Sequence, residues 1–154
     1  MTGYDIIVKD IPGMTIASIR DTIPQYSEVG SLYKELFPTL GRRFVRFAGP
    51  PLAIYHDPSF KEKDVDVEVA VPVKGRPKET GRIKVRDLEA ARVACIVHIG
   101  PYENFGQVYS ALMKWVEENG YKIAGPPREV HLKGPGFGTK PKDYVTEIQI
   151  PIVK

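Results

Sequence analysis

The sequence has little of several features that would define its class at once. It contains one cysteine, which excludes an internal disulfide framework and is typical of a reducing compartment. No apolar run approaches the roughly 18 residues that a membrane-spanning helix needs. The N-terminus lacks the basic and apolar regions of a signal peptide. Neither sign of charge dominates, because 22 basic residues face 19 acidic ones. We therefore expect a soluble, cytoplasmic protein that does not associate with membranes.

The small net charge and the spacing of the histidines narrow the function classes further. A formal net charge of +3 gives no electrostatic support for direct nucleic-acid binding. The 3 histidines form no HExxH pattern and Cys95 has no CxxC partner, so we predict neither a metal site nor a cofactor. What the chain does have is 154 residues, 42% of them hydrophobic. This is the length and composition of one domain with a sizeable core.

The periodicity of the apolar residues predicts an α+β protein. Every second residue from Val65 to Val71 is valine, which is the pattern of a half-buried strand. From Val29 to Leu40 the apolar residues instead recur every three or four positions, which predicts a helix. The full prediction is strands at 4–9, 14–22, 51–56, 64–73, 82–87, 91–99, 128–132 and 143–152, with helices at 24–41 and between Pro101 and Gly120.

The order strand–helix–strand–strand occurs twice, and the two copies align with each other. The helical stripes match in phase, and Ala48-Gly49-Pro50-Pro51 superposes on Ala124-Gly125-Pro126-Pro127. We infer tandem-duplicated strand–helix–strand–strand modules, with repeats over about 4–77 and 80–154, inside a single domain over 1–154. This arrangement predicts one curved antiparallel sheet with two main helices. It also predicts a groove at the pseudo-two-fold seam, where small-molecule sites tend to lie.

Several stretches of the second half resemble a known family. They are His98–Glu103 (HIGPYE), Trp115–Tyr121 (WVEENGY), Gly125–Val130 (GPPREV) and the closing Asp143–Ile152. Together they resemble the GyrI-like superfamily, which includes the effector-binding domains of AraC-type and multidrug-responsive transcription regulators. The resemblance covers nearly the whole chain. It implies a stand-alone effector-binding domain without the helix-turn-helix of those regulators, and it leaves open a protein partner such as a regulator or gyrase.

Glu147 is the central candidate residue. It shares one face of the last predicted strand with Val145 and Gln149, and a carboxylate on a central strand is costly to bury without a partner. In a groove rimmed by aromatic side chains it would bind a lipophilic cation through charge pairing and cation–π contact. The resemblance implies that role for the matching glutamate. The competing interpretation is an exposed glutamate on a polar sheet face.

The other candidates are the counterpart carboxylate and a set of rings. Glu68 aligns with Glu147, and its competing interpretation is a solvated acidic stripe. For the aromatic residues the competing interpretation is an ordinary core position, and for His131, which aligns with Tyr55, it is a packed histidine. The predicted ligand-binding set is Glu147, Glu68, Tyr33, Phe37, Tyr55, Tyr109, Trp115 and His131.

The predicted function is the binding of hydrophobic, often cationic small molecules in this groove. Two alternatives follow from the resemblance. Some relatives hydrolyse cyclopropane-containing electrophiles, which would make Glu147 a catalytic residue that activates water, with Tyr55 or Tyr109 as a second polar group. One branch of the family is named for inhibiting DNA gyrase, which would make this chain a protein-interaction module. The residues alone leave open whether the protein is an enzyme.

Overall fold

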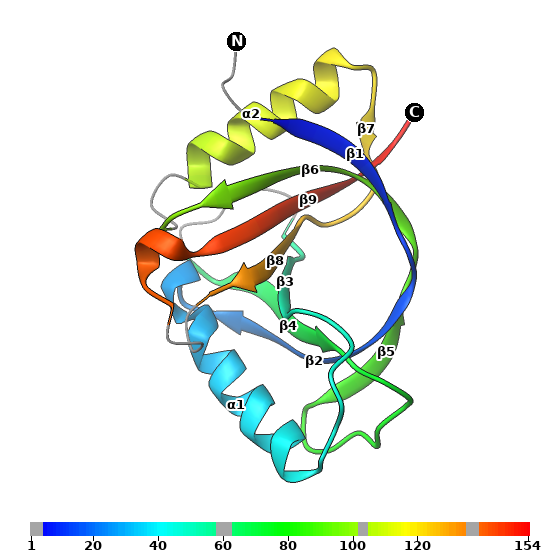
Figure 1. Ribbon diagram of the computed structural model, residues 1–154, viewed down its shortest axis with the longest axis vertical. Coiled ribbons are helices and arrows are strands. Elements are labelled where there is room, and N and C mark those ends of the chain that lie inside the picture. The colour runs from blue at the N-terminus through cyan, green and yellow to red at the C-terminus, as the bar shows by residue number, and fades with distance from the viewer. Residues whose placement is uncertain (1–4, 58–62, 102–104, 135–138) are drawn as a thin grey trace. The chain divides into compact units, whose positions relative to one another are not determined.

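The computed structural model describes residues 5–57, 63–101, 105–134 and 139–154. The chain divides into two compact units (Figure 1). The central unit is Gly13–Glu89, and the terminal unit combines Met1–Pro12 with Ala90–Lys154. No described helix is both long and apolar enough to cross a membrane.

The central unit is an antiparallel sheet packed against one helix. Its strands pair in the order β3-β4-β2-β5. Helix α1 buries Leu32, Leu36 and Leu40 against the valines of β4, as the apolar stripe predicted. The elements are β2 (Met14–Ile23), η1 (Tyr26–Glu28), α1 (Val29–Arg42), β3 (Leu52–Tyr55), β4 (Val65–Pro72) and β5 (Lys84–Leu88).

The terminal unit repeats this construction. Its strands pair in the order β1-β6-β9-β8, and the short β7 pairs with β9. Helix α2 buries Val108, Leu112 and Val116 against β6 and β9. The elements are β1 (Ile6–Ile11), β6 (Ala91–Ile99), α2 (Phe105–Glu118), β7 (Lys122–Ile123), β8 (Arg128–Lys133), η3 (Pro141–Asp143) and β9 (Val145–Val153).

Details of packing repeat along with the topology. A Cβ added at Gly49 would lie 3.3 Å from Cγ of Pro72, and one at Gly125 would lie 3.5 Å from Cβ of Pro151. The preceding alanine of each motif donates its backbone N–H to the same proline carbonyl, at 2.8 Å in both units. Each Ala-Gly-Pro-Pro motif therefore passes close to a proline ring, and a side chain at Gly49 would crowd that ring, whereas one at Gly125 would make an ordinary contact. The predicted α+β fold of duplicated modules is confirmed.

The units and the repeats read from the sequence have different boundaries. Strand β1 lies within the first repeat of the sequence but pairs with β6 in the terminal unit. Strand β5 lies within the second repeat but pairs with β2 in the central unit. The repeat boundaries 4–77 and 80–154 stay a prediction about the sequence. One element begins later than expected: the helix predicted from residue 24 starts at Val29, because the η1 turn at Tyr26–Glu28 comes first.

The equivalent core positions give a test of the duplicated packing. Leu36→Ala and Leu112→Ala should each lower the free energy of unfolding by about 2–5 kcal/mol, because each leaves a cavity under a helix. The measurement is urea unfolding followed by circular dichroism. The exposed Glu117→Ala on α2 is the control, expected within about 0.5 kcal/mol of the parent. A Leu112→Ala variant no less stable than this control would contradict the core assignment.

Candidate functional site

Each unit carries a glutamate on the face of its sheet that is turned away from the helix. Side chains alternate between the two faces of a strand. In β4 the residues Val65, Val67, Val69 and Val71 pack under α1, which places Glu68 on the other face. In β9 the residues Ile148, Ile150 and Ile152 pack under α2, which places Glu147 on the other face. Both glutamates are buried, Glu68 at 3% exposure and Glu147 at 7%.

Glu68 is surrounded by donors from three other segments of the central unit. Arg86 on β5 forms a bidentate pair with it, Nη2 to Oε1 at 2.7 Å and Nε to Oε2 at 2.9 Å. Ser18 on β2 donates its hydroxyl to Oε2 at 2.6 Å. His56 Nε2 lies 2.9 Å from Oε1, directly after β3. The interpretation of Glu68 as part of a solvated acidic stripe is therefore wrong, since its carboxylate is buried and saturated with donors.

These contacts decide the protonation state of Glu68. Burial raises the pKa of its carboxyl, but the hydrogen bonds from His56, Arg86 and Ser18 together outweigh burial and hold that pKa well below its ordinary value of 4.5. The same bidentate contact raises the pKa of Arg86. Glu68 is thus a fixed anion whose charge is balanced inside its own unit.

Glu147 has fewer partners. Lys9 on β1 donates its ammonium to Oε1 at 2.6 Å, and Gln149 donates its side-chain amide to Oε2 at 2.7 Å. Among the described residues Lys9 is the one cation paired with Glu147. The hydrogen bond to Glu147 raises the pKa of Lys9, and burial opposes it in part. The Lys9 side chain is still 40% exposed, so its ammonium lies at the boundary between the carboxylate and water.

Lys9 and Arg86 occupy equivalent positions in the two units. Lys9 pairs across strands with Val93, and Arg86 pairs with Ile16. Val93 and Ile16 match each other in the repeat alignment, in which Ala94 corresponds to Ala17. Each glutamate is therefore held by a cation from the same place on an edge strand, one strand beyond the nearest neighbour of the glutamate's own strand. The difference lies in the cation, because arginine binds a carboxylate with a planar fork and lysine binds it as a flexible point charge.

The sheet face around Glu147 also carries aliphatic side chains, beside the buried polar residues Arg128 and Gln149, which pair with each other across β8 and β9. Val97 lies opposite Glu147 on β6 and Val130 lies opposite it on β8. Ile7, Val97 and Ile99 are on the same face as Glu147 by strand alternation, and each is about half exposed or more. Exposed apolar side chains that gather beside a buried charge are typical of binding surfaces. We call Ile7, Val97 and Ile99 the aliphatic patch.

The predicted aromatic residues of the central unit lie on the helix side of the sheet. Tyr33 and Phe37 stack on α1 with ring centroids 5.8 Å apart. Tyr55 packs against Tyr26 at 5.5 Å. All three predicted residues contact the core under α1, so within this unit they lie across the sheet from Glu68.

The terminal unit shows the same separation. Tyr109 packs on the core under α2 and donates its hydroxyl to Glu129 Oε2 at 2.6 Å, while Trp115 stacks on Tyr121 at 5.9 Å. His131 pairs across strands with Thr146, on the face opposite Glu147, and burial lowers its pKa to about 4. Within each unit the structure thus brings no predicted ring to the face of the glutamate. The ligand-binding role of these rings stays a prediction.

Comparisons with known proteins place the chain in a family. The model of the GyrI-like small molecule binding domain matches residues 4–153. The chain belongs to the GyrI-like family. No curated protein gives a significant match.

Solved structures agree with this assignment of the GyrI-like domain. The C-terminal domain of EcmrR is 31% identical with a TM-score of 0.86, and the alignment covers 99% of each chain. EcmrR in its complex with DNA is 30% identical with a TM-score of 0.88, over 100% of this chain. This chain spans only 59% of that longer one. The structure of SAV2435 bound to tetraphenylphosphonium covers 97% of this chain and 94% of its own, with 13% identity and a TM-score of 0.62. At that identity it shows the fold alone.

Sequence reasoning about this GyrI-like domain missed the cations that hold the glutamates. Neither Arg86 nor Lys9 belongs to a sequence motif that gives it a role. The partners lie 18 residues from Glu68 and 138 residues from Glu147, and no local pattern links such positions. The repeat alignment alone does not reveal these cations. Lys9 and Arg86 are equivalent because β1 pairs with β6 in the same register in which β5 pairs with β2, and those registers are known only from the structure.

The Glu68 contacts predict a pH-dependent stability difference. Glu68→Gln should lower the free energy of unfolding at pH 7 by about 1.5–3 kcal/mol, because the neutral amide loses the charge-assisted hydrogen bonds with Arg86 and Ser18. Because the pKa of the Glu68 carboxyl is lower in the folded protein than its ordinary value of 4.5, the ionised carboxylate stabilises the fold at pH values above 4.5. This contribution is lost progressively as the pH falls below 4.5. The gap between parent and variant should therefore be constant from pH 7 to about pH 5 and shrink toward about pH 3.

Urea unfolding across this pH range measures the gap. The exposed Glu89→Gln in the same unit is the control, expected to stay close to the parent at every pH. A gap that does not change between pH 7 and about pH 3 would mean that the Glu68 carboxylate is not the stabilising species.

Proposed function

We propose that this GyrI-like domain binds a hydrophobic, positively charged small molecule at the carboxylate of Glu147. The observation that carries the proposal is the contrast between the two glutamates. Arg86, Ser18 and His56 make four contacts with Glu68, whereas Glu147 has two, one from the Gln149 amide and one from Lys9. The side chains of Arg86 and Lys9 are about equally exposed, at 39% and 40%, so the difference lies in the number and geometry of the contacts. Of the two anions, Glu147 is the one whose counter-ion can be exchanged without dismantling the fold.

A ligand that replaces Lys9 beside Glu147 must supply a positive charge, as Lys9 does. A buried carboxylate needs a cation, because desolvation penalises its charge. The Lys9 ammonium can return to water along its flexible stem, since the side chain is already 40% exposed. A lipophilic cation can then take its place, with its charge beside Oε1 of Glu147 and its apolar body against the aliphatic patch. Gln149 keeps its hydrogen bond to the other carboxylate oxygen.

The contacts favour binding over the hydrolase alternative. A general base accepts a proton from a bound water molecule. Lys9 and Gln149 use one acceptor position on each oxygen of Glu147, so a water molecule would have to share the carboxylate with a cation. The residues suggested as a second polar group are engaged elsewhere: Tyr109 donates to Glu129, and Tyr55 packs against Tyr26 on the helix side of its sheet.

Tetraphenylphosphonium is a suitable probe, since it combines a permanent charge with apolar rings and is the molecule bound to the relative SAV2435. It should raise the melting temperature of the parent protein, and Glu147→Gln should abolish this shift because the amide carries no charge. Glu117→Gln on α2, an exposed change of the same kind, should leave the shift intact. Retention of the full shift in Glu147→Gln would place the site elsewhere.

Lys9 should act as a competitor of a cationic ligand. Lys9→Met removes the internal counter-ion and keeps the length of the side chain, so tetraphenylphosphonium should bind about tenfold more tightly, measured by isothermal titration calorimetry. The exposed Lys122→Met in the same unit is the matched control for the loss of one positive charge. Weaker binding to Lys9→Met than to Lys122→Met would contradict displacement, because it would mean that Lys9 helps to hold the ligand.

A further inference from the structure

The two helices end in the same backbone motif with different residues. After α2, the N–H of Gly120 bonds to the carbonyl of Glu117 at 3.1 Å and that of Tyr121 to Val116 at 3.0 Å. After α1, the N–H of Phe44 bonds to Gly41 at 3.1 Å and that of Val45 to Leu40 at 3.1 Å. Both are Schellman motifs, whose left-handed position is normally glycine. Gly120 has φ +76° there and Phe44 has φ +56°.

Phe44 is a costly residue for this position. A left-handed backbone strains any residue that has a Cβ, and a bulky ring is rarely found there. Packing does not compensate, because Phe44 is 91% exposed, whereas its neighbour Val45 packs against the core. The equivalent Gly120 shows that the fold accepts glycine at this turn. A strained, exposed aromatic residue with no role in the core points to a contact made with something outside the chain.

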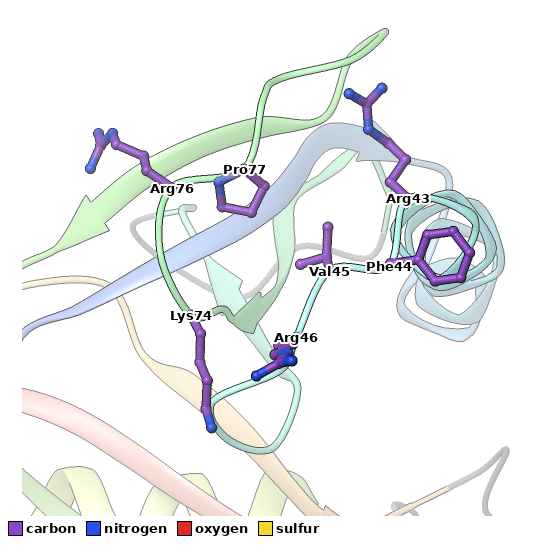
Figure 2. A pocket seen from close by; sticks show the side chains of 7 residues that line it. All are labelled: Arg43, Phe44, Val45, Arg46, Lys74, Arg76 and Pro77. Atoms are coloured by element: carbon purple, nitrogen blue, oxygen red, sulfur yellow. The ribbon is translucent and has the colours of Figure 1, made fainter.

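Cationic side chains surround the same turn. Figure 2 shows a depression at the end of α1 in which Val45 and Pro77 lie between Arg43 on one side and Arg46 and Lys74 on the other. Arg76, which also lines it, pairs with Asp87 at 2.9 Å. Arg43, Arg46 and Lys74 form no ion pair among the described residues. Three positive charges are thus gathered here without an ion pair from the part of the chain that the structure describes, and the formal net charge of the chain is only +3.

We propose that this surface, which we call the Phe44 surface, docks an acidic segment of a partner protein that also carries an apolar side chain. Arginine beside an exposed aromatic ring is the composition found at the centres of protein interfaces. The uncompensated cations complement aspartate and glutamate, and such complementarity steers association. The depression is shallow and open, which suits an extended segment better than an enclosed small molecule.

A single-stranded nucleic acid fits these observations less well. Strand binding uses several rings on which successive bases stack. The nearby Phe47 is 43% exposed, but it packs edge-on against Phe37 at 5.7 Å and does not line the depression. Phe44 is the one aromatic ring among the residues that line the depression. The proposal involves neither Glu147 nor Lys9, so it stands or fails independently of the proposed ligand.

The test uses the full chain and a fluorescein-labelled peptide of alternating Asp and Glu with one central Leu. We expect saturable binding by fluorescence anisotropy. Phe44→Gly should weaken it about tenfold, while thermal unfolding shows a stability equal to or above that of the parent, because the turn gains its usual residue. Arg46→Glu and Lys74→Glu should each weaken binding by a similar factor and reduce its salt dependence.

Matched controls separate local docking from general charge attraction. Lys34→Glu makes the same charge change as Lys74→Glu on an exposed face of α1 away from the depression, and should bind the peptide nearly as the parent does. The proposal is overturned if the peptide shows no binding up to about 1 mM, or if Phe44→Gly and Lys74→Glu bind as tightly as Lys34→Glu. Tighter binding of a labelled dodecathymidylate than of the peptide, lost in Phe44→Gly, would assign the surface to nucleic acid instead.

Discussion

A buried carboxylate on a central strand is the constraint on which the rest of this structure depends. Glu68 is 3% exposed and Glu147 is 7% exposed, and each lies on the sheet face that no helix of its unit covers. An anion in that position is tolerated only with a cation and further hydrogen bonds. Each unit supplies the cation from its own edge strand, β5 for Glu68 and β1 for Glu147. The pairing of those edge strands therefore serves charge balance as well as the hydrogen-bond ladder.

The duplication kept this plan while the donors diverged. Arg86 in the central unit corresponds to Lys9 in the terminal unit. Ser18, which donates to Glu68, corresponds to Cys95. Burial raises the pKa of the Cys95 thiol to about 11, so it gives Glu147 no comparable strong donor and is itself unreactive. One unit thus holds its anion with a rigid network and the other with a single flexible cation. In this member of a family of small-molecule binding domains, that difference is the basis for the ligand site proposed at Glu147.

The ends of the two helices diverged in the same manner. The hydrogen bonds of the two turns superpose, yet Gly120 in one unit corresponds to Phe44 in the other. Backbone geometry is preserved after duplication because the core beneath it depends on it. Solvent-facing side chains carry no such constraint and can acquire contacts of their own. A residue that departs from its repeat equivalent at an energetic cost is therefore a better pointer to function than one that matches.

The sequence by itself determined the main helices and strands and their α+β class, because helical and strand periodicities are local patterns of apolar residues. It also determined the duplication, because the two halves of the chain can be aligned residue by residue. It further determined that Glu147 and the isoleucines Ile148 and Ile150 lie on opposite faces of the last strand, because side chains alternate between the faces of a pleated strand. Tertiary structure alone decided which cation meets which glutamate. Lys9 and Glu147 are 138 residues apart, and only the registers of β1, β6 and β9 bring them within 2.6 Å. Cross-strand register is a property of the assembled sheet, and no periodicity along the chain encodes it.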